Sequence, residues 1–197
     1  PSQRSIRLPV ARKDILLLAS PAVVETVQCL AAAGLSELVE GALGDAVLFE
    51  LAAMLSLPGA PSQELHRDTT WAGEPEVLTI FLALADIPDK RWGPTEVILG
   101  THASPDWHTH DEFTPQCPPG VKGCVRNSGG TAILLARGDC LIIDSRILHR
   151  GGANVAGERL LFYISMRRQS AVPQNSTESL RDEYRGSKRT LAELPKW

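Results

Sequence analysis

The chain has 197 residues, of which 43% are hydrophobic and 22% are charged, and its formal net charge is −3. This size and composition are sufficient for one globular domain, and the slight negative charge excludes the basic surface that nucleic-acid binding requires. No uninterrupted apolar run reaches the roughly 18 residues needed to span a bilayer, so no membrane segment is predicted.

The N-terminal region is predicted to be helical. A Ser-Pro pair at residues 20–21 is typical of a helix start, because serine caps free N–H groups and proline fits the first turn. Apolar residues then recur at helical spacing up to Ala31. Gly34 can end this helix in a left-handed conformation, and a second helix is predicted from Ser36 to about Leu43. Within a single domain of residues 1–197, we therefore expect residues 1–45 to form a helical cover.

After Gly44 the pattern changes to short apolar runs bounded by Gly, Pro, Asp or Asn, which predicts strands and turns. The first run is also rich in Leu, Ala and Met, which favour helix as well. Many short strands behind a helical layer indicate a mainly β sandwich or jelly roll, with its core in residues 46–168. The tail, residues 169–197, is predicted to carry a short capped helix from Ser176 to about Gly186 and to be solvated. The predicted strands are Ala46–Leu57, Val77–Ala85, Glu96–Leu99, Thr131–Ala136, Asp139–Asp144 and Leu160–Met166.

Four cysteines are too few for a disulfide scaffold. Cys29 and Cys140 fall in apolar patterns that predict buried, inert thiols. Cys117 and Cys124 lie in a loop rich in Gly and Pro, where they could form a disulfide if the protein meets oxidant. Because cytosolic thiols usually stay reduced, free thiols are favoured.

The segment from Pro105 to Gly130 shows little periodicity, and a loop of this length in a compact domain is usually functional. It carries His108 and His110 ahead of two cysteines, and two His with two Cys could bind structural zinc. The His-x-His spacing is not that of a usual zinc finger. A loop that covers the substrate is therefore the favoured interpretation.

The triplet His66-Arg67-Asp68 is the first candidate for chemistry. In an extended segment, residues two apart point to the same side, so an imidazole and a carboxylate converge. An apolar strand that begins near Asp139 is predicted to deliver His149 at its far end, and a pair of glycines behind it lets other groups approach closely. Two His and one carboxylate can occupy one face of an octahedral iron(II) ion and leave the opposite face for substrate and dioxygen. Together, these residues predict an iron site.

Arg159 stands ten residues beyond His149, at the start of the last predicted strand. If the two strands are antiparallel and joined by the Gly151–Gly157 loop, Arg159 returns into the same cavity as His149. A guanidinium buried in an apolar barrel needs an anion, and its planar fork matches a carboxylate. This predicts a co-substrate with a distal carboxylate, whereas a surface arginine that pairs with Glu158 is the simpler alternative.

In their order and spacing, these segments resemble the phytanoyl-CoA dioxygenase family of iron(II)/2-oxoglutarate-dependent oxygenases from about Ala46 to Met166. The family shows a P-G-x-x-x-Q-x-L-H-x-D approach to the first ligand, a G-P-x-x-x-x-P-G-[ST]-H segment, and a distal H-x-G-x-x-N followed by Arg. This chain matches the pattern at Pro58–Asp68, Gly93–His102, His149–Asn154 and Arg159, except that Leu99 stands where Pro is usual.

The resemblance implies a double-stranded β-helix, a cupin-like jelly roll, with iron(II) held by His66, Asp68 and His149 and 2-oxoglutarate held by Arg159. It implies hydroxylation of a small organic substrate with dioxygen, while 2-oxoglutarate is decarboxylated to succinate and ascorbate supports activity. Related halogenases leave the carboxylate position vacant for halide, so Asp68 favours hydroxylation.

The resemblance also suggests further pocket residues. Phe81 lies where the family often carries an aromatic residue beside the co-substrate, and Thr79 faces the same side of that strand; both could equally fill the barrel. His102 is expected to be structural. Gly151 stands where some relatives place a serine near 2-oxoglutarate. A basic residue upstream of the first ligand helps to hold the co-substrate in some members, and the sequence does not show which residue takes this role here.

Two other functions fit the same residues. The barrel could bind metal or 2-oxoglutarate without turnover, or the three ligands could hold zinc in a hydrolase, although Arg159 would then lack a role. The expected partner is a small molecule, whose identity depends on the loops around the barrel mouth. Because the chain opens on Pro1, we expect the natural N-terminus and any targeting peptide to be missing. Localisation is therefore open, with the cytoplasm favoured, and so is the oligomeric state.

Overall fold

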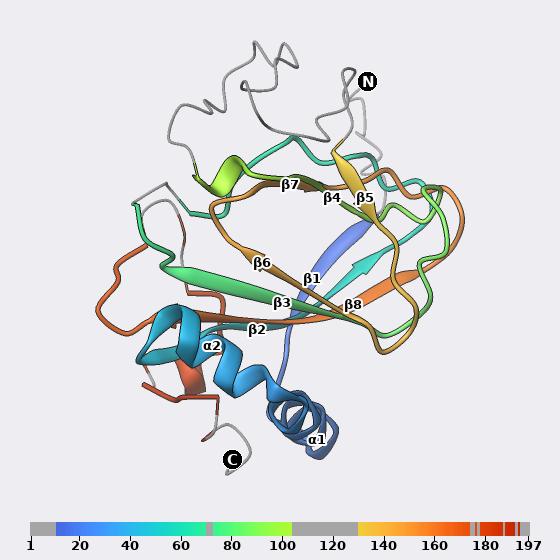
Figure 1. Cartoon of the computed structure of the whole chain (residues 1–197). Coiled ribbons are helices and arrows are strands. Elements are labelled where there is room, and N and C mark those ends of the chain that lie inside the picture. The colour runs from blue at the N-terminus through green and yellow to red at the C-terminus, as the bar shows by residue number, and fades with distance from the viewer. Residues whose placement is uncertain are drawn as a thin grey trace, which may run out of the picture.

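Two antiparallel sheets form the body of the protein (Figure 1). The computed structural model describes residues 11–69, 73–103, 130–173, 176, 178–186, 188–191 and 193. The strands are β1 Arg12–Leu16, β2 Ala46–Ser56, β3 Val77–Ala83, β4 Thr95–Ile98, β5 Thr131–Ile133, β6 Cys140–Asp144, β7 Leu148–Gly151 and β8 Arg159–Arg168. The large sheet has the order β1-β2-β8-β3-β6 and the small sheet the order β5-β4-β7. This arrangement confirms the predicted mainly β jelly roll.

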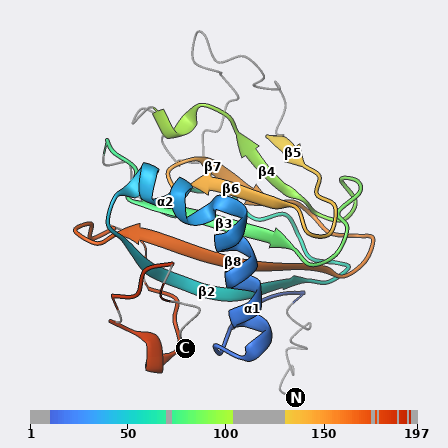
Figure 2. The ribbon, with the colours of Figure 1, turned by 60° about the horizontal axis from the view of Figure 1, so that its bottom comes forward.

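A helical layer covers the outer face of the large sheet (Figure 2). It consists of α1 (Pro21–Leu30), a single π-helical turn η1 (Ala31–Leu35) and α2 (Ser36–Leu43). The N-cap prediction is confirmed, because the Ser20 side chain accepts a hydrogen bond from the Val23 N–H. Gly34, with φ of 92°, takes the left-handed conformation that separates the two α-helices, as expected.

The helical stretch from Pro21 to Leu43 has 23 residues and a mean hydropathy of 1.4 in its most apolar window. By length and composition alone it could cross a membrane, and 22% of that window is buried inside the protein. No membrane segment was predicted here because Glu25, Thr26 and Gln28 interrupt the apolar run. In the structure, the segment packs one stripe of side chains, among them Val27 and Val39, onto the large sheet.

Strand β8 divides the core into two layers because its successive side chains point to opposite faces. Phe162, Ile164 and Met166 belong to the cluster beneath the helices. Leu161 and Tyr163 belong to the cluster between the two sheets. The functional side chains described below lie on this second, inward face.

Two strand predictions were wrong in detail. Strand β1 lies in the region that was expected to be only helical, and it pairs with β2 at the edge of the large sheet. The apolar run that leads to His149 is not one strand: β6 belongs to the large sheet and β7 to the small sheet. A turn at residues 145–147 carries the chain between them, which a pattern of apolar residues cannot reveal.

The C-terminal tail is not the solvated face that was expected. Its described helical part is only a 3-10 turn, η3 (Asp182–Tyr184), because the chain instead follows β2: the Ser179 N–H donates to the Phe49 carbonyl and the Leu51 N–H to the Ser179 carbonyl. Leu180 and Leu191 are buried in the cluster beneath the helices.

The prediction of buried thiols was also wrong. Cys29 and Cys140 are both exposed and free, because each lies on the solvent side of its element. Cys117, Cys124, His108 and His110 lie outside the described residues, so the zinc and disulfide predictions are not tested.

Candidate metal centre

The segments that carry the two histidines are directly paired. The His66 N–H donates to the His149 carbonyl at 3.0 Å, and the His149 N–H donates to the His66 carbonyl at 2.9 Å. The Asp68 N–H donates to the Ser145 carbonyl in the turn that precedes β7. Segments far apart in the sequence are thus held in register by backbone hydrogen bonds.

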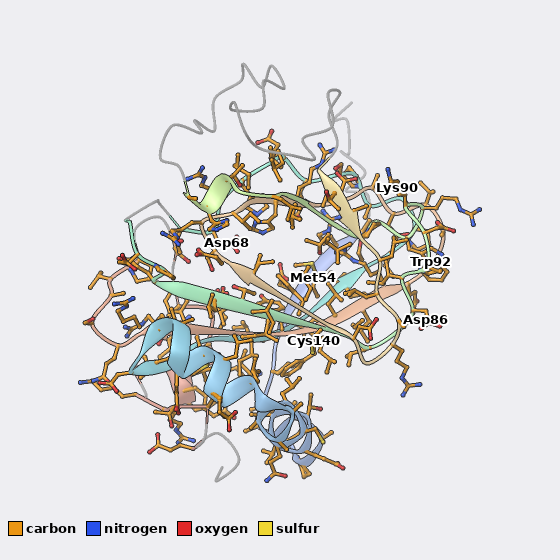
Figure 3. All side chains as sticks on the ribbon, in the orientation of Figure 1. Met54, Asp68, Asp86, Lys90, Trp92 and Cys140 are labelled. Carbon is orange, nitrogen blue, oxygen red and sulfur yellow. The ribbon has the colours of Figure 1, made fainter. Side chains whose placement is uncertain are left out.

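The three predicted ligands converge on one point. His66 Nε2 lies 3.5 Å from one Asp68 carboxylate oxygen, and His149 Nε2 lies 3.6 Å from the other. Each residue offers one atom that could bind a metal ion, and these three atoms lie within 4.8 Å of one another. His149 is buried, whereas the side chains of His66 and Asp68 are 38% and 33% exposed, so the cluster opens to one side. Figure 3 shows Asp68 and Met54 in the space between the sheets.

The imidazole tautomers suit a metal ion. His66 Nδ1 lies 2.8 Å from the Glu64 carbonyl and His149 Nδ1 lies 3.0 Å from the Ile147 carbonyl. A carbonyl can only accept, so each Nδ1 carries a proton, and in the neutral imidazole Nε2 is then the nitrogen that can bind a metal ion. In metal sites, the ring nitrogen of a histidine that does not bind the metal usually donates its N–H to a carbonyl or carboxylate in this way. The donor set therefore fits a divalent metal ion.

The pKa shifts at the cluster favour a metal ion at two of the three residues, His149 and Asp68. Burial lowers the pKa of His149, which favours the neutral imidazole that a metal needs. Burial opposes ionisation of Asp68, but the hydrogen bond from His66 and the nearby imidazole charges together outweigh it and lower the pKa of that carboxyl. The hydrogen bond to Asp68 raises the pKa of His66, so a proton competes with a metal ion at that position.

Arg159 lines the same cavity, a space of about 190 Å³ between the sheets. The predicted strand pairing was wrong, since β7 and β8 lie in different sheets, but the predicted position inside the cavity is confirmed. The side chain is 1% exposed; its Nη1 donates to the Gly93 carbonyl and its Nη2 lies 3.3 Å from Met54 Sδ. Its Nε has no hydrogen-bond partner and no described carboxylate pairs with it. Burial and the charge of Arg12 lower the pKa of Arg159 to about 10.

Two neighbours that the sequence analysis missed extend this donor group. Arg12, Ser56 and Arg159 stand side by side in register across β1, β2 and β8. The Ser56 hydroxyl is fully buried without a hydrogen-bond partner, and so is Arg12 Nε. Asp14 acts on Arg12, whereas no described acid pairs with Arg159 or Ser56, so this group of adjacent donors can accommodate an anion. Arg12 is a candidate for the basic residue that could not be placed from the sequence, and recognising β1 would have been needed to find it.

Gly151 makes room for this arrangement. A Cβ atom at that position would lie 2.7 Å from Gln63 Oε1 and 3.2 Å from Arg12 Nη2. Gln63 instead accepts the Gly151 N–H at 2.7 Å, and Arg12 donates to the Gly152 carbonyl at 3.0 Å. The position where some relatives carry a serine is thus occupied here by the two longer side chains.

Of the two interpretations left open for Phe81 and Thr79, the structure shows the first, because both residues line the cavity. The Phe81 ring packs beside the Tyr163 ring, with centroids 5.8 Å apart. The Thr79 hydroxyl lies 2.9 Å from the Ser165 hydroxyl and 3.3 Å from that of Ser145. Phe81 therefore contributes an apolar wall, whereas Thr79 is already engaged in a buried hydrogen-bond chain.

The remaining sequence motif residues hold the ligand strands in place. The Thr101 hydroxyl donates to the Ile98 carbonyl and accepts the Leu148 N–H, both at 2.8 Å, next to His149. Asn154 donates to the carbonyls of Ser56 and Gly157. His102 is not among the described residues that line the cavity.

We expect Thr101→Val to lower the free energy of unfolding by about 1–3 kcal/mol, because the substitution leaves the buried Leu148 N–H without an acceptor. It should also weaken divalent-metal binding by about 10- to 100-fold, since β7 then holds His149 less firmly. Chemical denaturation and calorimetric titration with Mn²⁺ measure these effects. Thr131→Val, at an exposed position of β5, is the matched control, and equal denaturation midpoints for the two variants would contradict the assigned role.

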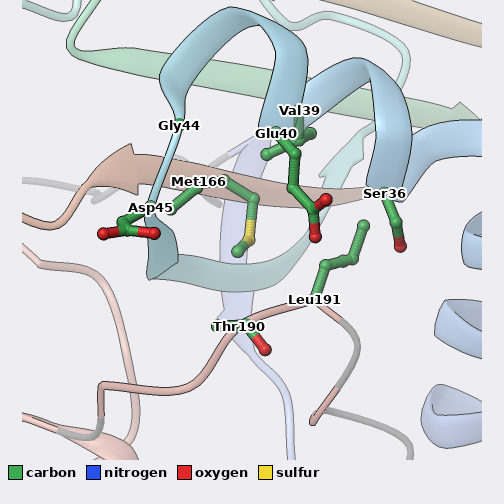
Figure 4. Close-up of a pocket in the computed structure, with 9 residues that line it drawn as sticks. Ser36, Val39, Glu40, Gly44, Asp45, Met166, Thr190 and Leu191 are labelled. Atoms are coloured by element: carbon green, nitrogen blue, oxygen red, sulfur yellow. The ribbon is translucent and has the colours of Figure 1, made fainter.

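A second hollow of about 300 Å³ lies between α2 and the tail, on the other side of the large sheet (Figure 4). Val39, Met166 and Leu191 form its apolar floor, and Glu40 and Asp45 stand at its rim. Its described lining contains neither His nor Arg, and the metal-type cluster lies elsewhere. We therefore assign the chemistry to the smaller cavity between the sheets.

Comparison with known proteins agrees with this geometry. A family model described as Phytanoyl-CoA dioxygenase (PhyH) matches residues 8–159. Dioxygenase aneA of Aspergillus aculeatus is 34% identical over 106 residues, which cover 49% of this chain and 31% of that protein. The chain therefore spans about a third of the length of this curated relative.

Two solved structures share the fold. The epimerase SnoN, in complex with Fe³⁺, alpha ketoglutarate and nogalamycin RO, superposes with a TM-score of 0.59 at 22% identity, over 87% of this chain and 73% of that chain. HygX from Streptomyces hygroscopicus, with nickel, 2-oxoglutarate and hygromycin B bound, superposes with a TM-score of 0.63 at 14% identity, over 89% and 77%.

Proposed function

Because the chain belongs to the phytanoyl-CoA dioxygenase family, we propose that it is an iron(II)/2-oxoglutarate-dependent dioxygenase that hydroxylates a small organic substrate. The observation that carries this proposal is the pairing, in one cavity, of an open His-Asp-His cluster with a buried guanidinium that has no acid partner. The His-Asp-His cluster fits a metal ion that keeps coordination positions free for substrate and dioxygen, and the guanidinium fits an anion.

In this proposal, His66, Asp68 and His149 hold iron(II), and Arg159 binds the distal carboxylate of 2-oxoglutarate with help from Arg12 and Ser56. The bound metal and co-substrate supply the oxidising power: dioxygen, 2-oxoglutarate and a C–H bond of the substrate give a hydroxyl group, succinate and carbon dioxide. Ascorbate is expected to keep the iron reduced.

The protein itself positions and shields these groups. The backbone carbonyls at Glu64 and Ile147 fix the two imidazoles with Nε2 directed at the metal position. Phe81 and Leu161 form apolar walls that exclude water from the space between the cluster and Arg159. Asp68 fills the carboxylate position, which supports hydroxylation rather than halogenation.

The buried Arg159 also supports this proposal over a zinc hydrolase. A hydrolase that used the same three ligands would leave a guanidinium without counter-ion in a cavity, and such a charge is costly to bury. An anionic co-substrate removes that cost.

The proposal is tested by following succinate formation from 2-oxoglutarate with iron(II), ascorbate and a panel of small substrates. We expect succinate to form and to depend on iron(II), and one panel member to gain a hydroxyl oxygen from labelled dioxygen. Binding of Mn²⁺ and 2-oxoglutarate without any turnover across the panel would favour the non-catalytic alternative. Absence of 2-oxoglutarate binding would overturn the proposal.

A further inference from the structure

Glu50 is an acid in the cavity between the sheets that the proposed reaction does not use. It stands on β2, where the register with β8 shifts between Leu48 and Glu50. Such a bulge redirects the side chains that follow it and is common beside active sites. As a result, Glu50 lines the same cavity as the metal-type cluster and Arg159, although it is surrounded along β2 by apolar residues.

A chain of buried hydroxyl groups holds this carboxylate in place. The Ser165 hydroxyl donates to Glu50 Oε2, and it lies 2.9 Å from the Thr79 hydroxyl. Thr79 is in turn 3.3 Å from the Ser145 hydroxyl, and all three hydroxyl residues are at most 2% exposed. The Ser165 hydroxyl proton is used in the hydrogen bond to Glu50. The Thr79 hydroxyl must therefore donate to Ser165, and the Ser145 hydroxyl must donate to Thr79. The chain therefore presents Glu50 as an oriented acceptor.

Glu50 has no basic partner among the described residues. The charges that act on it come from Asp68 and Asp14, and these, after burial itself, raise the pKa of the Glu50 carboxyl. Asp14 lines the same cavity and accepts a hydrogen bond from Tyr163. Ser165 and Ser179 donate hydrogen bonds to Glu50, but the ionised form of a buried acid whose charged neighbours are acids stays unfavourable unless a bound molecule supplies a positive charge.

With iron(II) and 2-oxoglutarate bound as proposed, the cavity still has an excess of negative charge. Iron(II) and the dianion of 2-oxoglutarate cancel each other. Of the three carboxylates at the cavity, those of Asp14 and Asp68 can be offset by Arg12 and Arg159. One negative charge remains, and Glu50 is the acid that no described cation approaches.

We propose that Glu50 is a specificity-determining residue that pairs with a protonated amine of the substrate, so that the enzyme acts on a cationic small molecule. This inference rests on the proposed function of the same cavity. Two further features suit an ammonium group: the rings of Phe81 and Tyr163 line the cavity, and cations bind favourably over aromatic faces.

The size of the cavity limits what can enter. A space of about 190 Å³ is smaller than the roughly 300–1,000 Å³ of a typical drug-sized site, and 2-oxoglutarate takes part of it. Only the amine-bearing end of a substrate therefore reaches Glu50. A small primary amine is consequently a suitable probe.

The test compares n-butylammonium with its neutral isostere 1-butanol. Each is titrated calorimetrically into protein that is loaded with Mn²⁺ and 2-oxoglutarate. We expect n-butylammonium to bind wild type at least about tenfold more tightly than 1-butanol, and Glu50→Gln to remove that preference. Glu37→Gln, the same substitution at an exposed site on α2, should retain it.

The stability of the unloaded variant provides a separate readout. Burial raises the folded-state pKa of Glu50 above its unfolded value, so ionised Glu50 destabilises the fold at neutral pH. We expect Glu50→Gln to melt higher than wild type at pH 7.5, and this gain should vanish as the pH falls below the unfolded pKa. A variant that melts higher but has lost the amine preference is folded and lacks only the specific contact.

The outcomes separate the two proposals. If wild type binds 2-oxoglutarate but shows no preference for n-butylammonium, or if Glu50→Gln keeps that preference, the inference about Glu50 is wrong and the proposed function stands. If 2-oxoglutarate itself does not bind to Mn²⁺-loaded wild type, the proposed function fails first.

Discussion

Replacing His149 with alanine is expected to lower 2-oxoglutarate turnover by at least about a hundredfold. Loss of a residue that only orients a metal ligand typically costs about 10- to 100-fold, and His149 is proposed to be a ligand itself. Its side chain is the most buried of the three proposed ligands, so a water molecule cannot easily take the place of its Nε2 as a metal ligand. The measurement is succinate release under saturating iron(II), together with the metal content of the protein.

His102→Ala is the matched control for this substitution, because His102 lies outside the described lining of the cavity. It should retain both metal binding and turnover. The His149 variant should remain folded without metal, since its backbone pairing with His66 does not use the imidazole. Unchanged turnover in folded His149→Ala protein would show that the His-Asp-His cluster is not the metal centre.

Replacing Arg159 with methionine is expected to weaken 2-oxoglutarate binding by about 2–5 kcal/mol, which corresponds to about 30-fold to several thousandfold in Kd. The guanidinium is buried and lines the cavity, and its fork suits a carboxylate. Arg159→Lys should bind with intermediate affinity, because an ammonium group keeps the charge and loses the fork. Titration of Mn²⁺-loaded protein with 2-oxoglutarate measures these affinities.

The unloaded Arg159 variant separates a binding role from a structural one. Burial lowers the pKa of Arg159 to about 10, so the fold disfavours its charged form. Removing that charge should leave the melting temperature of the unloaded protein unchanged or raise it. Arg91→Ala, which removes an arginine from an exposed ion pair with Asp89, should change neither affinity nor stability measurably. Equal 2-oxoglutarate affinity in wild type and Arg159→Met would contradict the proposed binding of 2-oxoglutarate by Arg159.

The local predictions that succeeded depend on residues close in sequence. The cap at Ser20 and the left-handed Gly34 follow from backbone chemistry that involves only a few neighbours. The strands at Ala46–Ser56 and Val77–Ala83 follow from long apolar runs bounded by turn residues. In contrast, β1 is short and mostly exposed, so it leaves no such run, and it is defined only by its pairing with β2.

The tail illustrates the same limit. Leu180 and Leu191 are isolated apolar residues in a polar stretch, and nothing local predicts that they are buried. They are covered because the backbone at Ser179 and at Arg189 forms hydrogen bonds with β2 and carries them against the sheet. Burial that arises from distant contacts cannot be read from a local pattern.

The sequence by itself determined the class of this protein, through the order and spacing of His66-x-Asp68, the Gly-Pro and Gly-Thr-His segment, His149 and Arg159. Such motifs can be recognised in a sequence because each ligand needs a particular atom type at a particular spacing. Only the tertiary structure decided that Arg12 and Ser56 stand beside Arg159, and that Glu50 shares their cavity without a basic partner. The physical reason is that electrostatic balance in a cavity is a sum over side chains from several strands, and cross-strand register determines which of them meet.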